Sequence, residues 1–381
     1  MSVTTLNAIR ATATSAYQDT VPLATMDNIT EVGKAVLESP STIQNEFLAA
    51  LINKVGLQLF NDRQFTNPLI GLQKGKLEYG QTIEDIFVEM AQAKNYITGT
   101  REGESVPDQF EVNKAIAETG YYSKIFGKQY FKTVHRDDLK RAFFNEGGVN
   151  RLVSSIMTAM QNGQNFDDYR MTIALIARQI EQCLEDAETK WNGDIHLITD
   201  YHATVAPLEV GEDPLTPDEA LASKAFLTYM ANQIKKYSQR LTSPRTDFNP
   251  AGVTSWAPKG EQRLMMIEDI QSDLDTNLLA WAYNSGKLEI GSVDLINAWY
   301  SIGNPESGSV SPEDIVVKGE LGATGPVVAV LYHPNMVKIY NKTTVSSTSE
   351  NARGLYYNVF NTYEDYFACS PFENFVAFFL D

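Results

Sequence analysis

The longest amphipathic pattern in the chain runs over residues 166–191. Apolar residues recur there at intervals of four, three, four, three and four, namely Tyr169, Ile173, Ile176, Ile180, Cys183 and Ala187. Such intervals place side chains on one face of an α-helix. The pattern predicts a long helix with a single narrow apolar seam, whose core contacts are made by Ile173, Ile176 and Ile180. Asp167 and Asp168 fall at its predicted N-terminus, where the helix dipole favours negative charge.

Three further segments have helical spacing. They cover 41–60, with Ser41 as a candidate N-cap, and also 220–241 and 272–284. The first twenty residues are rich in Thr, Ala and Ser, and this composition predicts a mobile or extended segment. Two prolines in "GEDPLTPDEA" predict a linker at 211–220 and a domain boundary.

Alternation of period two dominates residues 76–135, which predicts two long strands joined by the polar tip "TGTREGESVPDQFE". On the returning strand, basic side chains alternate with apolar ones on the same face. Lysines in this position commonly protect a sheet edge from pairing. The second interpretation is a basic ribbon that lies on the acidic surface of a neighbouring subunit. The candidate contact residues are Lys124, Lys128, Lys132 and Arg136, with Glu102 and Glu104 at the tip.

Apolar runs predict shorter strands at 196–205, 263–270, 325–334, 336–341 and 375–380. Ten of the last thirty residues are Phe or Tyr. We expect this aromatic tail to supply core strands that pack on the long helix, since aromatic side chains are usually buried.

Composition narrows the function. The 381 residues are 43% hydrophobic and 21% charged, as in a globular protein, and the formal net charge is −17. This charge argues against a protein whose main task is to grip DNA, although simple solubility would also explain it. No apolar run is long enough to span a membrane, and no secretory signal begins the chain, so we expect a cytosol-like compartment. Two cysteines do not predict a disulfide framework.

No catalytic, cofactor or metal motif emerges from the sequence. The four histidines have no partners at metal-ligand spacing, and "HRDD" at 135–138 has none of the companion motifs of a kinase. "DLDTN" at 273–277 departs from a calcium loop at its glycine and glutamate positions. A loop-rich chain of this length without such motifs is typical of a protein that works through contacts with other subunits.

Several segments resemble one family. "VPLATMDNITEVGKAVL", "NPLIGLQKGKLEYGQTIEDIF" and "ARGLYYNVF…FENFVAF" are similar to segments of the major capsid proteins of phi-twenty-nine-like small podoviruses, and they occur in the same order. The resemblance begins near Val21 and covers most of the chain. It implies the α+β capsid fold of tailed bacteriophages, of the HK-ninety-seven type.

On that template the chain divides into five regions. They are an N-terminal arm with a short helix (1–65), an extended loop or E-loop (66–135), a peripheral domain with the spine helix (136–220), an axial domain (221–329) and a return to the peripheral domain (330–381). The chain leaves no room for the C-terminal immunoglobulin-like module of some relatives. Nor does it begin with a long scaffolding segment, so the resemblance implies a separate scaffolding protein.

The resemblance implies a structural protein without enzymatic activity. Copies would assemble into hexamers and pentamers of an icosahedral or prolate head, with a portal and non-specifically held double-stranded DNA as further partners and no membrane. The virion would be its final location and the host cytoplasm its place of assembly. Two alternatives remain at this point: a compartment shell of the encapsulin type, and an enzyme with an unrecognised site.

Overall fold

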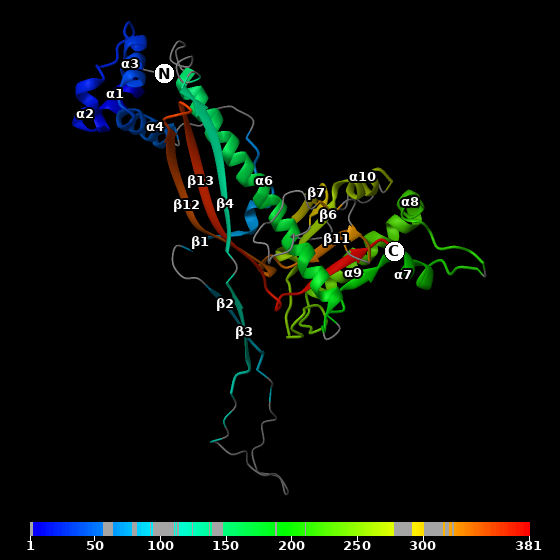
Figure 1. Ribbon diagram of the computed structural model, residues 1–381. Coiled ribbons are helices and arrows are strands. Elements are labelled where there is room, and N and C mark those ends of the chain that lie inside the picture. Colours follow the sequence, from blue (N-terminus) through cyan, green and yellow to red (C-terminus); the bar gives the residue numbers. More distant parts are fainter. Residues whose placement is uncertain are drawn as a thin grey trace. The chain divides into compact units, whose positions relative to one another are not determined.

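The structure is a computed structural model with both helices and sheets. It describes residues 3–55, 64–77, 82–91, 93, 110, 112, 114–123, 125–136, 138, 148–186, 189–209, 211–277, 292–300, 315–316, 320–321 and 324–381. The chain forms two compact units. Unit 1 comprises 1–79, 125–170 and 340–366, and unit 2 comprises 80–124, 171–339 and 367–381. Figure 1 shows the elements of both.

Unit 1 begins with four helices, α1 (Val3–Thr12), α2 (Ser15–Thr20), α3 (Ile29–Glu38) and α4 (Ser41–Val55). The prediction of a mobile or extended N-terminus is therefore wrong. Leu6, Ile9 and Tyr17 are buried in the core of this unit. The Arg10 guanidinium donates hydrogen bonds to carbonyl oxygens at the end of α2, at 2.6 and 2.8 Å. Burial of a few apolar side chains thus orders a segment whose overall composition is polar. Residues 56–60 of the predicted second helix lie outside the described residues.

The sheet of unit 1 has the strand order β1-β12-β13-β4, with β1 (Gln73–Lys76), β12 (Val337–Asn351), β13 (Tyr356–Cys369) and β4 (Ile125–His135). The 3-10 helix η1 (Ile70–Leu72) precedes β1. Strand β4 runs antiparallel to β13, in register from Ile125↔Tyr366 to His135↔Tyr356. The prediction that 76–135 forms one pair of long strands is therefore partly wrong.

The predicted returning strand is two strands with different partners. β3 (Ala117–Tyr122) pairs with β2 (Ile83–Val88) in unit 2, whereas β4 pairs with the C-terminal part of the chain in unit 1. The polar and apolar alternation continues across the break between them. An alternation of period two shows which face of the sheet each side chain occupies, but it does not show which strand lies next to it.

Helix α6 (Gly148–Glu185) contributes residues to both units. It begins 18 residues before the predicted start at 166 and ends at Glu185. Asp167 and Asp168 therefore lie in its middle, and their assignment to a helix N-terminus is wrong. Ile173, Ile176 and Ile180 are 0% exposed. Every residue from 171 to 177 is buried, so this stretch has no solvated face and the expected single narrow seam is not found.

The main sheet of unit 2 has the order β5-β14-β11-β6-β7, and the short strand β10 (Glu320–Leu321) also pairs with β11. The strands are β5 (Asp194–His196), β14 (Phe375–Phe379), β11 (Thr324–Tyr332), β6 (Arg263–Ile267) and β7 (Ser292–Ile296). Two-residue strands β8 (Trp299–Tyr300) and β9 (Ile315–Val316) pair separately. All five residues of β14 are fully buried. The aromatic tail thus contributes β14 to the same sheet as β6, and β6 belongs to the region that was expected to form the axial domain.

Helices α7 (Leu197–Thr204), α8 (Pro217–Ala222), α9 (Lys224–Leu241) and α10 (Glu268–Asn277) belong to unit 2, with the 3-10 helices η2 (Lys259–Glu261) and η6 (Pro334–Met336). The strand predicted at 196–205 is wrong except at His196, the last residue of β5, because 197–204 form α7. This helix turns Tyr201 into the core against Phe226 and Tyr229. Within the predicted linker, Thr216 and Glu219 form a capping box that starts α8. No helix in the described ranges is long and apolar enough to cross a membrane.

Candidate assembly surfaces

The β2–β3 hairpin has two chemically different faces. Side chains at odd positions of β2 are half-buried, whereas those at even positions are exposed. The exposed face carries Ile86 (57% exposed), Val88 (54%) and Tyr121 (67%). A two-stranded hairpin is marginally stable alone, and an apolar strip on its outer face is typical of an interaction surface.

The inner face of this hairpin is anchored within unit 2 by Asp85. Lys338 Nζ lies 3.2 Å from Asp85 Oδ1, and the Ser370 hydroxyl donates a hydrogen bond of 2.6 Å to Asp85 Oδ2. Phe87 stacks on Phe372 with 5.8 Å between ring centroids. The hairpin base is therefore held by an ion pair to Lys338 of β12 and by polar and aromatic contacts to the 370–374 loop between β13 and β14.

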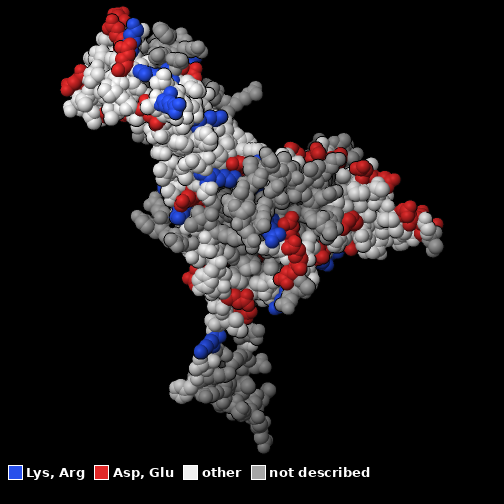
Figure 2. All heavy atoms as spheres, viewed as in Figure 1, with Lys and Arg blue, Asp and Glu red and all other residues white. Residues whose placement is uncertain are grey.

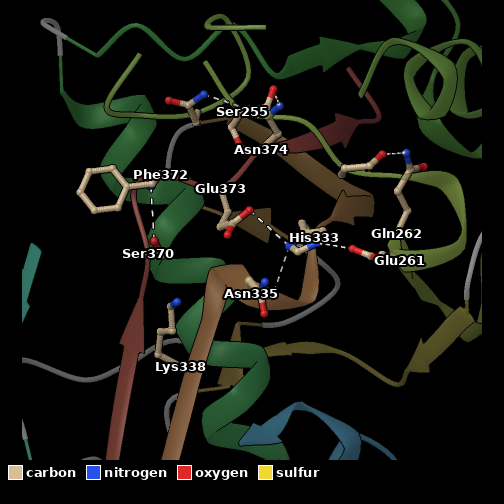
Figure 3. A network of polar contacts seen from close by, with 12 residues as sticks. Ser255, Glu261, Gln262, His333, Asn335, Lys338, Ser370, Phe372, Glu373 and Asn374 are labelled. Carbon is tan, nitrogen blue, oxygen red and sulfur yellow. Dashed lines mark hydrogen bonds and ion pairs between the residues drawn. The ribbon is translucent and has the colours of Figure 1, made fainter. Parts of the chain in front are cut away.

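The same loop contacts a buried histidine (Figure 3). His333 Nδ1 lies 3.2 Å from Glu373 Oε2, and His333 Nε2 lies 3.1 Å from Glu261 Oε2. Burial acts to lower the pKa of His333, but the hydrogen bonds and charges of Glu373 and Glu261 outweigh it and raise that pKa above its ordinary value. We call this three-residue cluster the His333 clamp.

Asn374 fixes the far end of the loop. Its side chain donates to the Ser255 carbonyl oxygen and accepts from the Asn249 amide, each at 2.8 Å. Its own carbonyl oxygen accepts a hydrogen bond of 3.3 Å from the His333 backbone N–H. Because Asn374 is completely buried and makes three hydrogen bonds, the loop is most firmly held at this end.

The predicted row of contact lysines does not form one free surface. Lys128 Nζ lies 3.2 Å from Asp167 Oδ2, which also accepts a hydrogen bond of 2.7 Å from the Tyr130 hydroxyl. Lys128 therefore has an acidic partner within unit 1. Lys132 is exposed and Arg136 is half-buried. Lys124, Glu102 and Glu104 lie outside the described residues, and the expectation that this set contacts another subunit stays a prediction.

A buried carboxyl lies beside that ion pair in unit 1. Burial, with the charge of Asp365 adding to it, raises the pKa of Asp168 to about 7. Asp365 in β13 is itself buried and accepts a hydrogen bond of 2.6 Å from Asn341. The sequence pattern did not reveal this pairing, because the two carboxyls are almost 200 positions apart and meet only when α6 packs on β13.

The outer face of β4 and β13 has no charged side chain over 127–135 and 356–362. Phe131 and Phe360 face each other across the strands with 6.0 Å between ring centroids. Hydrogen-bonded polar pairs flank them, Gln129 with Thr362 and Thr133 with Asn358. The sequence did not predict this face, because its paired residues lie 225 and 233 positions apart in the chain.

Net charge is divided very unequally. Unit 1 contains 15 Lys and Arg and 15 Asp and Glu, whereas unit 2 contains 16 and 33, so the whole −17 belongs to unit 2. Figure 2 shows acidic side chains, with few basic ones, on the part of unit 2 that carries α7, α8 and α10. Contacts between copies through this part would bring like charges together.

The structure also locates the residues that sequence analysis considered for chemistry. Cys183 is buried, and this burial raises its pKa to about 11, which disfavours the reactive thiolate. Within the described ranges no three His, Cys, Asp or Glu side chains are grouped so that they could hold a metal ion.

Comparison with known proteins adds to this geometry. A family model described as "Phi29-like phage major capsid protein" matches residues 6–379. The chain belongs to this family. Its curated relatives include the major capsid proteins of Bacillus phages B103 and PZA. Each is 26% identical over 376 residues, which make up 98% of this chain and 72% of the relative.

Solved structures show the same fold. The capsid structure of Staphylococcus phage Andhra matches with a TM-score of 0.58 and 12% identity, covering 85% of this chain and 87% of that one. The capsid structure of cyanophage P-SCSP1u matches with a TM-score of 0.53 and 11% identity, covering 86% and 91%. The fold is thus the α+β tailed-phage capsid fold of the HK-ninety-seven type, as the resemblance implied.

Family membership makes this chain a major capsid protein, a structural component of the virion that associates with copies of itself. The alternatives of an encapsulin-type compartment shell and of an enzyme receive no support from these comparisons.

Proposed function

We propose that copies of this chain form hexamers and pentamers of an icosahedral or prolate head that encloses double-stranded DNA. The observation that carries the proposal is the β2–β3 hairpin, which is anchored on one face and leaves an apolar strip exposed on the other. In a family whose members build shells, another copy of the same chain is the surface that would cover this strip. We further propose that the chain has no enzymatic activity.

The regional assignment follows from this proposal. We assign the E-loop to the 66–135 region. Its described strands have different partners, because β2 pairs with β3 and β4 pairs with β13. Residues 1–65 act as the N-terminal arm region, 136–220 and 330–381 as the peripheral domain, and 221–329 as the axial domain.

A separate scaffolding protein and a portal complete the proposed assembly, which takes place in the host cytoplasm and requires no membrane. DNA is held weakly and without sequence preference. The support is electrostatic: strong DNA binding requires concentrated Lys and Arg, whereas unit 2 carries twice as many acidic as basic residues.

The test compares two valine substitutions of matched exposure. Val88→Asp places a charge on the exposed hairpin face, and Val345→Asp does the same on β12, where Val345 is 52% exposed. Both variants are expected to remain folded, since neither side chain is in the core. In co-expression with the scaffolding protein, only the Val88 variant is expected to lose particles in electron micrographs. Normal particles from Val88→Asp would contradict the proposed hairpin contact.

A further inference from the structure

The 370–374 loop of unit 2 is held on one side by a hydroxyl–carboxylate hydrogen bond and on the other by a contact with the imidazole of His333, which can gain or lose a proton. On one side, Ser370 donates to the carboxylate of Asp85, at the base of the hairpin. On the other side, Glu373 accepts from the imidazole of His333. The Ser370 backbone N–H also donates to the Met336 carbonyl oxygen at 2.8 Å, close to that imidazole in the chain. The loop therefore connects a titratable side chain to the hairpin.

The imidazole can satisfy both carboxylates only when it carries two protons. The charged groups that face it are Glu261 from η2 and Glu373 from the loop, and each needs an N–H donor from the ring. A further ion pair, between Lys338 of β12 and Asp85 of β2, lies on the hairpin side. Because the His333 side chain is only 10% exposed, water cannot readily replace a lost donor.

The backbone determines which contact is lost on deprotonation. The Asn335 backbone N lies 3.3 Å from His333 Nδ1, and His333 is the N-cap residue of the 3-10 helix η6. A neutral ring can accept a hydrogen bond from this backbone N–H through Nδ1 while its remaining proton stays on Nε2, toward Glu261. The Nδ1 lone pair then faces the Glu373 carboxylate, and an attraction becomes a repulsion.

Glu261 and Glu373 differ in how easily they can move away. The Glu261 side chain is 63% exposed and can turn into solvent without disturbing its neighbours, whereas the Glu373 side chain is 21% exposed. Asn374, the next residue, is locked by its own hydrogen bonds. Displacement of Glu373 must therefore be taken up on the N-terminal side of the loop, where Ser370 and Phe372 hold the hairpin.

We propose that the His333 clamp is a proton-dependent latch that fixes the base of the β2–β3 hairpin when His333 is charged and loosens it when His333 is neutral. The raised pKa of His333 is consistent with a latch that is closed in mildly acidic solution and opens as the pH rises. The inference does not depend on the proposed hairpin contact with another copy, because the latch acts within one chain.

Hydrogen exchange of the full, unassembled chain tests the latch. Amide protection in 83–88 and 117–122 is measured at pH 6.0 and pH 8.5, after correction for the chemical exchange rate. In the native sequence we expect protection to fall about three- to tenfold at the higher pH, as the charge-assisted hydrogen bond is lost. Equal protection at both pH values would overturn the proposal.

Two variants separate the latch from other pH effects. Glu373→Gln keeps the side-chain shape and removes its negative charge, so a neutral Nδ1 no longer faces a carboxylate and the hairpin should stay protected at both pH values. His135→Asn removes an exposed imidazole of unit 1 and should leave the native response unchanged. A native-like loss of protection in Glu373→Gln would show that the response comes from elsewhere and would overturn the latch.

Discussion

Replacement of Ile176 by alanine tests the packing of α6 in unit 2. Ile176 is 0% exposed and lies between Ile173 and Ile180, which are equally buried. The substitution removes three carbon atoms from the core. At about 0.8 kcal/mol per buried carbon, the lost transfer free energy is about 2.4 kcal/mol. A cavity remains because the all-round burial of 171–177 leaves little room for collapse, so we expect a total loss of about 3–4 kcal/mol in the free energy of unfolding.

The assay is urea unfolding of the unassembled chain followed by tryptophan fluorescence. All four tryptophans, Trp191, Trp256, Trp281 and Trp299, belong to unit 2, so their signal reports on the unit that contains Ile176. This matters because the two units need not unfold in one step. The variant should lower the transition midpoint without changing the slope of free energy against urea.

Ile86→Ala is the matched control, because Ile86 belongs to the same unit and is 57% exposed. Its effect should stay within about 0.5 kcal/mol. An Ile176→Ala midpoint equal to that of the native chain would refute the conclusion that burial of Ile176 in α6 stabilises unit 2. An equally large loss in Ile86→Ala would refute the use of burial to rank these positions.

Other substitutions test the charged groups. The pKa of Asp168 is raised to about 7, so in the folded chain this carboxyl keeps a proton that an ordinary carboxyl has lost. Unit 1 should therefore lose stability as the pH rises from about 4 to about 7 and stay level above that. Asp168→Asn should flatten this profile in thermal unfolding followed by circular dichroism, and an unchanged slope would count against the assignment. Lys128→Glu should destabilise the subunit, because it places a carboxylate beside Asp167, whereas Lys132→Glu should leave it folded. If Lys132 meets an acidic group of another copy, Lys132→Glu should also reduce particle yield at low salt, with recovery at high salt, although each exposed pair is worth only about 0.2–1 kcal/mol. The chain should bind short duplex DNA weakly in fluorescence anisotropy, and a nanomolar, salt-sensitive complex would contradict the electrostatic argument.

Some elements could be predicted because their cause is local. The spacing of apolar residues predicted α9, β6, β11 and β14, and it identified Ile173, Ile176 and Ile180, all of which are fully buried. Side-chain direction along a helix or strand follows from backbone geometry alone, so a pattern in the sequence is enough to find it. The order of the resembling segments was similarly sufficient to identify the family.

Contacts between distant segments could not be predicted in this way. The alternation through 121–135 gave no sign that β3 and β4 have different partners, and the lysine row gave no sign that Lys128 is paired with Asp167. The N-terminal helices were hidden by a polar composition, since only a few of their side chains enter the core.

The His333 clamp illustrates the same limit. From the sequence, His333 was one of four scattered histidines, with Glu261 72 positions before it and Glu373 in a turn of the aromatic tail. Periodicity records how each segment presents its side chains and leaves open which segments meet. The sheet order that joins β6, β11 and β14 brings both carboxylates within 3.2 Å of the imidazole, because strand pairing is set by the burial of whole faces and not by any short stretch of chain.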